Sequence, residues 1–227
     1  MKSLLDKGVY GFPEAARLAR VEAANMRRWF LGRTDQSETR PVLRSDIPAI
    51  GEKHAISFLD LIDLRVVGRF REFGISMQTI RRVYQRLGEE VGSQHAFAHS
   101  NLCVYGKTVM QRVADEDGNE ELREVLSGQR AMPRILKDFL SDIQYSERDG
   151  LAERWNIHQG VVIDPLRNLG KPISVSSGAG THALARAYEA NSNDADLVAD
   201  LFNTSRRAVL DAVAFELSLA TGGRTAA

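Results

Sequence analysis

The stretch Tyr10-Gly-Phe-Pro-Glu-Ala-Ala-Arg-Leu-Ala-Arg-Val-Glu-Ala-Ala-Asn-Met-Arg-Arg-Trp-Phe30 predicts two short helices joined by a tight turn. Pro13 suits the first turn of a helix, where its missing N–H would have no partner, and Glu14 follows where the helix dipole favours an acid. Small residues at the crossing and Val21 at the corner are typical of a helix-turn-helix. The side chains expected in its core are Ala15, Ala16, Leu18, Met26, Trp29 and Phe30.

The exposed face of the second predicted helix carries candidate DNA-binding residues. Small side chains at Ala23 and Ala24 permit insertion into the major groove, and Asn25, Arg27 and Arg28 can read bases or hold phosphates. Ordinary solvated charges on an amphipathic helix are the alternative explanation. The motif around these residues favours contact with double-stranded DNA.

A second pair of helices is predicted after a loop at residues 31–57. Apolar residues recur at helical spacing from Phe58 to Phe70, Gly74 can end that helix, and Ser76 can cap the next one. The apolar positions are Phe58, Leu59, Ile62, Val66 and Phe70, then Ile80, Val83, Tyr84 and Leu87. Arg81 and Arg82 lie on the polar side with Arg86, where they either contact phosphates or keep the helix soluble.

The middle of the chain predicts short strands. Residues 95–106 alternate and are rich in β-forming side chains, and the turn cluster at 115–120 suggests a hairpin between 109–113 and 122–125. A helix is the alternative for the second arm of that hairpin. Further short strands are predicted at 143–145, 154–156 and 161–165.

The last segment, 195–216, predicts a second helix-turn-helix-like pair. Asn203 can adopt the left-handed turn conformation and Ser205 can cap the helix that follows. The expected apolar positions are Leu197, Val198, Leu201 and Phe202 in the first helix, then Val209, Leu210, Val213 and Phe215 in the second. We therefore predict a mainly α fold of the α+β class, with a DNA-binding domain at 1–112, a hairpin and linker at 113–140 and a helical domain at 141–227.

Charge divides the chain into two halves, although the net charge of all 227 residues is zero. Residues 1–112 carry 18 Lys and Arg against 12 Asp and Glu, and residues 113–227 carry 12 against 18. A basic half is suited to a polyanion such as DNA. The acidic half, with Asp194, Asp196, Asp200 and Asp211 around its helix pair, is suited to a basic protein partner instead.

Composition points to a globular cytoplasmic protein. The hydrophobic content of 43% is enough for two small domains, and no signal peptide or membrane-spanning run is expected. The single cysteine, Cys103, excludes an internal disulfide and fits a reducing compartment.

No arrangement of residues indicates a catalytic site, so we expect the protein not to be an enzyme and to need no cofactor. His95, His99 and Cys103 have a spacing unlike common zinc patterns, and no metal is expected there. Residues 177–181, Ser-Gly-Ala-Gly-Thr, lack the lysine of a phosphate-binding loop, and a glycine-rich turn before a helix is the better explanation.

The sequence also resembles known families. Phe73-Gly-Ile-Ser-Met-Gln-Thr-Ile-Arg-Arg82 is similar to the start of the last helix in the DNA-binding part of MerR-type regulators. The second half resembles a small domain family of unknown function found in antitoxin-like proteins. The matching residues are Ala152-Glu-Arg-Trp155, Val162-Ile-Asp-Pro165, Gly170-Lys-Pro-Ile173, Gly180-Thr181, and Val198-Ala199 through Val209. Arg20 and Glu22 depart from the helix-turn-helix pattern, which usually has Gly and then Ser, Thr or Pro.

The order of the two halves resembles large VapB-like antitoxins, whose partners are PIN-domain ribonuclease toxins. The resemblance implies a DNA-binding antitoxin of a type II toxin–antitoxin system, which represses its own operon and neutralises such a toxin. A MerR-like, ligand-responsive transcription regulator is the main alternative, and a structural adaptor without DNA affinity is another. We expect a homodimer, because proteins with one short recognition helix usually read paired half-sites.

Overall fold

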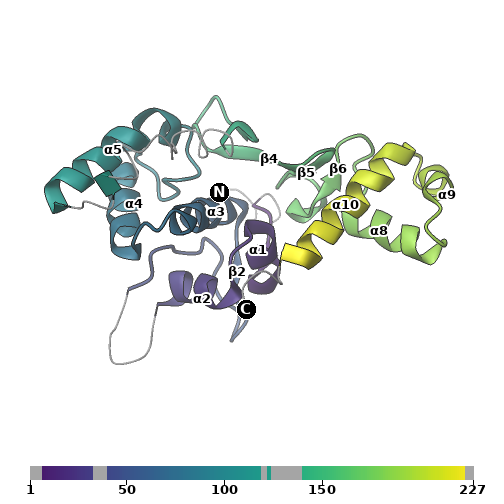
Figure 1. The fold of residues 1–227 in the computed structure, drawn as a ribbon, viewed down its shortest axis with the longest axis horizontal. Coiled ribbons are helices and arrows are strands. Elements are labelled where there is room, and N and C mark those ends of the chain that lie inside the picture. The colour runs from purple at the N-terminus through teal and green to yellow at the C-terminus, as the bar shows by residue number, and fades with distance from the viewer. Residues whose placement is uncertain (1–6, 33–39, 119–121, 124–139, 223–227) are drawn as a thin grey trace. The chain divides into compact units, whose positions relative to one another are not determined.

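The computed structural model describes residues 7–32, 40–118, 122–123 and 140–222, and the chain forms two compact units (Figure 1). The N-terminal unit is Tyr10–Glu153. The C-terminal unit is Arg154–Ala227 together with Met1–Val9. Helices with small antiparallel sheets make the fold α+β, as predicted.

Helices dominate the N-terminal unit. Its elements are β1 (Tyr10–Gly11), α1 (Phe12–Ala19), α2 (Ala23–Leu31), β2 (Ala55–Ile56), α3 (Phe58–Glu72), α4 (Met77–Val91), α5 (Asn101–Asp117) and β3 (Ile143–Tyr145). Strands β1 and β2 pair in antiparallel fashion, with Tyr10 opposite Ile56. Both of these side chains are fully buried, so the short ribbon ties the start of α1 to the segment that leads into α3.

Both short helices predicted for residues 10–30 are present, as α1 and α2. Pro13 lies in the first turn of α1, and all six side chains expected in the core are buried. Arg20 ends α1 in the left-handed conformation, with φ 53° and ψ 47°, and the N–H of Val21 donates to the carbonyl of Ala16 at 2.9 Å. An arginine therefore adopts the turn conformation that glycine reaches most easily.

Val21 fills the corner between the two helices and lies against α3. A Cβ atom added to Gly68 of α3 would lie 2.7 Å from Cγ2 of Val21. Arg65, one turn earlier on α3, donates a hydrogen bond from Nη1 to the carbonyl of Ala19 at 3.0 Å. The α1–α2 turn is thus held on α3 by close packing and by one side-chain hydrogen bond.

Helix α3 ends and helix α4 begins at the predicted residues. Gly74 has φ 82° just after α3, and the hydroxyl of Ser76 accepts a hydrogen bond from the N–H of Thr79 at the start of α4. The predicted apolar positions are buried, except that Leu59 and Tyr84 remain partly exposed.

The strands predicted between residues 95 and 125 are wrong where the structure describes this stretch. Helix α5 contains both the end of 95–106 and all of 109–113. Its buried residues Leu102, Val109, Met110 and Val113 recur at helical spacing. The alternation within residues 95–106 had indicated a strand instead. Gly118 ends the helix with φ 59°, so the predicted turn cluster begins as a helix terminus. In the predicted second arm, Leu122 and Arg123 are helical, and residues 124–125 lie outside the described residues.

The described residues of the C-terminal unit combine a small sheet with α-helices and a short 3-10 helix. Its elements are β4 (Ala152–His158, whose first two residues precede the unit), β5 (Val161–Ile163), η2 (Asn168–Gly170), β6 (Ile173–Ser174), α8 (Thr181–Ala190), α9 (Ala195–Leu201) and α10 (Arg206–Gly222). Within this unit, β5 pairs in antiparallel fashion with β4 and β6. The strands predicted at 143–145 and 154–156 are confirmed as β3 and part of β4, and the strand predicted at 161–165 is confirmed over residues 161–163 as β5. Helix α8 follows the glycine-rich turn, also as predicted.

The predicted turn chemistry of the last helix pair is confirmed, but part of its apolar stripe is wrong. Asn203 has φ 47°, and the hydroxyl of Ser205 accepts a hydrogen bond from the N–H of Ala208. Helix α9 buries Ala195, Val198 and Ala199 against α8 and α10. Leu197 and Leu201 point away from this core and are 44% and 62% exposed, because two turns of helix bury only one narrow face.

Candidate nucleic-acid interface

The outer face of α2 presents the residues predicted to contact DNA. Met26, Trp29 and Phe30 are buried on its inner face. The helical period places the remaining side chains of the helix on the side opposite this core. Four of the predicted residues are exposed, namely Ala23, Ala24, Arg27 and Arg28. The fifth, Asn25, is half-buried.

A short hydrogen-bond chain joins two of the predicted side chains. Arg28 donates from Nη2 to Oδ1 of Asn25 at 2.6 Å, and Asn25 donates from Nδ2 to Oε2 of Glu22 at 3.0 Å. The side chain of Arg27 makes no hydrogen bond or ion pair with another of the described residues. The face therefore combines one outward cation with an arginine oriented by a neutral amide.

The two predicted residues of α4 have surroundings different from those on α2. Arg81 is half-buried and donates from Nη2 to the carbonyl of Arg40 at 2.6 Å, so it holds the segment that follows residue 39. Arg82 is exposed and lines a small cavity with Arg86 and Glu116, which form an ion pair at 3.0 Å. The described contacts join Asn25 and Arg28 but do not link the α4 arginines to them.

Sequence reasoning missed Arg65, which positions the helix pair. It is half-buried, and loss of hydration lowers its pKa to about 10 although Glu72 lies nearby. Its spacing from Ile62 and Val66 on the buried stripe of α3 was the available signal, because a cation there needs a specific acceptor.

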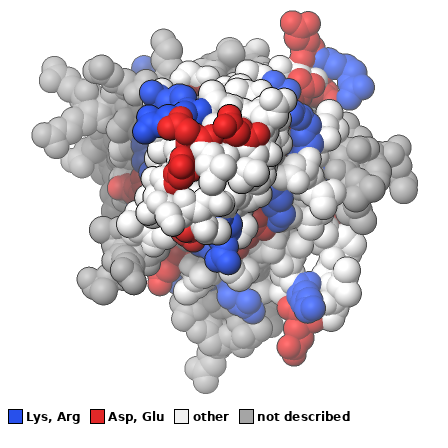
Figure 2. All heavy atoms as spheres, turned by 90° about the vertical axis from the view of Figure 1, so that its right-hand side faces the viewer, with Lys and Arg blue, Asp and Glu red and all other residues white. Residues whose placement is uncertain are grey.

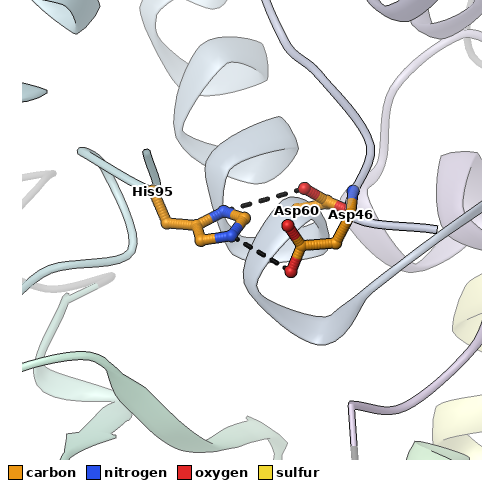
Figure 3. A group of neighbouring side chains, drawn as sticks. All are labelled: Asp46, Asp60 and His95. Atoms are coloured by element: carbon orange, nitrogen blue, oxygen red, sulfur yellow. Dashed lines mark hydrogen bonds and ion pairs between the residues drawn. The ribbon is translucent and has the colours of Figure 1, made fainter. Parts of the chain in front are cut away.

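A buried cluster around His95 was also missed. Nδ1 of His95 lies 3.1 Å from Oδ2 of Asp63 and 3.7 Å from Oδ1 of Asp60, and Nε2 lies 3.3 Å from Oδ2 of Asp46. Figure 3 shows the two ring nitrogens of His95 facing the Asp46 and Asp60 carboxylates. Asp63 also accepts hydrogen bonds from the N–H groups of Phe97 and Ala98. The participants are separated by up to 49 residues in the chain, so local patterns could not reveal them.

Burial and charge shift the pKa values in this cluster in defined directions. Burial raises the pKa of Asp60 to about 6 against the opposing effect of the Ser57 N–H, and burial also raises the pKa of Asp63. Burial alone would lower the pKa of His95, but its hydrogen bond to Asp63 and the surrounding carboxylates outweigh this effect and raise it to about 9. His95 is therefore protonated at neutral pH in these surroundings.

Comparison with known proteins gives two long matches. The chain is 28% identical over 191 residues to a Mycobacterium tuberculosis protein named "Putative antitoxin VapB45", which covers 76% of this chain and 79% of that protein. The crystal structure of Rv2018 from Mycobacterium tuberculosis has a TM-score of 0.73 at 26% identity, covering 90% of this chain and 96% of that chain. This chain is similar to both proteins across both of its units. No protein-family model matches the sequence.

One further finding concerns membranes. In the described part of the chain, no helix has the length and apolar character needed to cross a bilayer.

Proposed function

We propose that this protein is the antitoxin of a type II toxin–antitoxin pair, and that it binds operator DNA with its N-terminal unit and a ribonuclease toxin with its C-terminal unit. The observation that carries the DNA-binding part is the exposed α2 face with Asn25, Arg27 and Arg28. Similarity to the VapB45 protein over most of the chain supports the antitoxin part. Such a role is regulatory and involves no catalytic step by this chain.

DNA binding would use α2 as the helix that enters the major groove. Ala23 and Ala24 leave room for the backbone of the helix to approach the bases. Arg28 is oriented by Asn25, as a guanidinium must be to meet a guanine edge with two hydrogen bonds, while Arg27 is available to bases or phosphates. The excess of basic residues in 1–112 would attract the phosphate backbone.

A homodimer fits this mode of recognition. Helix α2 has nine residues, so a single copy reads only a few base pairs. Two copies would read two half-sites and would repress transcription of the operon by covering its promoter.

Toxin binding is proposed for α9, which leaves apolar side chains exposed. Leu197 and Leu201 are four residues apart and lie on one side of the helix, next to the exposed Asp196 and Asp200. Apolar contacts surrounded by acidic groups suit a basic partner surface. Figure 2 shows Asp and Glu side chains beside residues drawn in white on the face that carries this end of the C-terminal unit, with Lys and Arg side chains next to them. The expected partner is a PIN-domain ribonuclease.

A ligand-responsive regulator is the second candidate, and one cavity favours it. A groove of about 840 Å³ runs along α4 and is lined by Arg44, Arg81, Tyr84 and Gln94, among others. This volume is within the range of small-molecule sites. A ligand there would contact the same arginine that holds the carbonyl of Arg40.

The deciding experiment is co-expression with the product of the adjacent gene, followed by purification through this chain and titration with promoter DNA. The proposal expects a stable complex that lacks ribonuclease activity and binds promoter DNA more tightly than unrelated DNA. A chain that purifies alone and binds promoter DNA only with an added small molecule would favour the ligand-responsive regulator. A chain without DNA affinity in low salt would refute both.

A further inference from the structure

The cluster around His95 has the composition and spacing of a metal site. Asp46, Asp60 and His95 each offer one ligand atom, and these atoms lie within 4.8 Å of one another (Figure 3). They come from the segment before β2, the first turn of α3 and the connection between α4 and α5. Of the three, Asp60 is almost fully buried, whereas the side chain of Asp46 is 26% exposed and gives access to solvent.

The imidazole of His95 is oriented as metal-binding histidines usually are. Its Nδ1 lies 3.1 Å from Oδ2 of Asp63, and that carboxylate is itself fixed by the Tyr84 hydroxyl at 2.9 Å. A carboxylate on one ring nitrogen fixes the ring and makes the other nitrogen a better ligand. Here that other nitrogen, Nε2, faces Asp46.

The distance between Nε2 of His95 and Oδ2 of Asp46 suits shared ligation. It measures 3.3 Å, whereas a charge-assisted hydrogen bond is about 2.7–2.9 Å long. Two ligands each about 2.0–2.1 Å from a tetrahedral zinc ion are roughly 3.3–3.4 Å apart. Oδ1 of Asp60 lies 3.7 Å from Nδ1 of His95, and one ligand atom from each of the three residues lies within 4.8 Å of the others, so a movement of the Asp60 side chain toward Nε2 would add a third ligand.

The charges of the cluster favour a cation. Three carboxylates, those of Asp46, Asp60 and Asp63, surround one imidazole, so these four side chains keep a net negative charge even with the ring protonated. A buried excess of negative charge is costly, and a divalent cation would neutralise it. One imidazole nitrogen with carboxylate oxygens suits zinc or manganese better than calcium or magnesium, which prefer oxygen ligands alone.

We propose that Asp46, Asp60 and His95 bind a divalent transition-metal cation of the zinc class, with water completing the coordination and Asp63 as the positioning residue behind His95. The cation would take the place of the proton on Nε2. It would tie the segment before β2 to α3 and to the α4–α5 connection. Its role would be to stabilise the N-terminal unit, so this inference does not depend on the antitoxin assignment.

The test uses the full-length protein, freed of metal with a chelator and then dialysed. Titration with Zn²⁺ is followed by calorimetry and, in parallel, by thermal unfolding. We expect one equivalent to bind and the unfolding temperature to rise with the Zn²⁺ concentration. Mg²⁺ is expected to give neither effect.

Three variants and one control locate the binding site. Asp46→Asn and His95→Gln each remove a ligand and are expected to weaken Zn²⁺ binding at least tenfold. Asp63→Asn removes the carboxylate that positions the His95 imidazole and is expected to weaken Zn²⁺ binding roughly 10- to 100-fold. His182→Gln removes an exposed histidine of the C-terminal unit and is expected to change nothing. If His95→Gln does not fold, Asp46→Asn still decides, because its side chain lies at the partly exposed side. Absent saturable binding, or binding unchanged in Asp46→Asn and the folded His95 variant, would overturn the proposal.

Discussion

Each unit contains two helices joined by a left-handed residue, and the two pairs differ in the surroundings of their arginines. Arg20 with φ 53° joins α1 to α2, and Asn203 with φ 47° lies between α9 and α10. In the C-terminal pair, both arginines form ion pairs. Nε of Arg206 lies 3.4 Å from Oδ2 of Asp196, and Nε of Arg207 lies 2.8 Å from Oδ1 of Asp211.

In the N-terminal pair, neither Arg27 nor Arg28 forms an ion pair with a described residue, and Glu22 is linked to Arg28 only through Asn25. Arg28 donates to the neutral Asn25, and Arg27 has no ion pair there. Similar local geometry thus presents available cations in one unit and neutralised ones in the other. A helix pair alone does not determine its ligand; the charges around it do.

The first helices of the two pairs also differ. Helix α1 buries its apolar residues, including Phe12 and Leu18, whereas α9 leaves Leu197 and Leu201 exposed. An exposed apolar pair on a short helix is available to another protein. The difference therefore favours DNA as the ligand of the first pair and a protein partner for the second, and each assignment can be tested.

The largest effect is expected from removing the α2 arginines. Arg27→Ala with Arg28→Ala should weaken operator binding by about 1–3 kcal/mol for each base that these side chains read, or lower the salt dependence if they hold phosphates. Fluorescence anisotropy with promoter DNA at several salt concentrations measures both. The matched control, Arg206→Ala with Arg207→Ala, should leave binding unchanged. A stronger effect in the control would reverse the assignment of the two pairs.

The packing of α1–α2 on α3 should be sensitive to one added methyl group. Gly68→Ala places a Cβ against Val21 and should lower the free energy of unfolding by about 1–3 kcal/mol, although alanine otherwise favours a helix. Denaturant unfolding measures the change. In a Val21→Ala background the same substitution should be tolerated, and an equal penalty there would place the strain elsewhere.

The exposed leucines of α9 should affect binding and not folding. Leu197→Ser with Leu201→Ser should change the stability by less than about 0.5 kcal/mol and weaken toxin binding by about 1–2 kcal/mol. Calorimetry with the co-expressed partner measures the affinity. Leu217→Ser, which alters another exposed leucine on α10, is the control. Unchanged affinity in the double variant would remove α9 from the toxin interface.

The smallest expected effect is on the free energy of unfolding, and it should differ between the turn residues Arg20 and Asn203. Arg20→Gly should raise the free energy of unfolding by about 0.5–1 kcal/mol, because glycine adopts a positive φ without a Cβ clash. Asn203→Gly should change it less, since asparagine already tolerates this conformation. Urea unfolding of both variants tests the difference. Destabilisation by Arg20→Gly would mean that the arginine side chain itself contributes to folding.

Much of the local structure could be predicted from the sequence. Pro13, Gly74, Ser76, Asn203 and Ser205 mark helix ends correctly, because capping depends on a few neighbouring residues. The failure at residues 95–113 has a related cause. A short alternating run is compatible with a strand until the longer helical period of α5 is considered.

The candidate site was predictable only in part. The α2 face follows from helical periodicity, so Ala23, Arg27 and Arg28 were placed on the exposed side correctly. The half-buried position of Arg81 was not predicted, because its hydrogen bond to the carbonyl of Arg40 joins segments 41 residues apart. The same limit applies to Arg65 and Ala19.

By itself, the sequence determined the helix boundaries at its caps, the composition of the two halves and the residues on each helix face. The tertiary structure decided which arginines meet acids, which leucines of α9 remain exposed and that His95 lies among Asp46, Asp60 and Asp63. Caps and periodicity arise within a few residues of the chain. Burial and charge pairing depend on residues brought together by folding, and they set the energies on which binding depends.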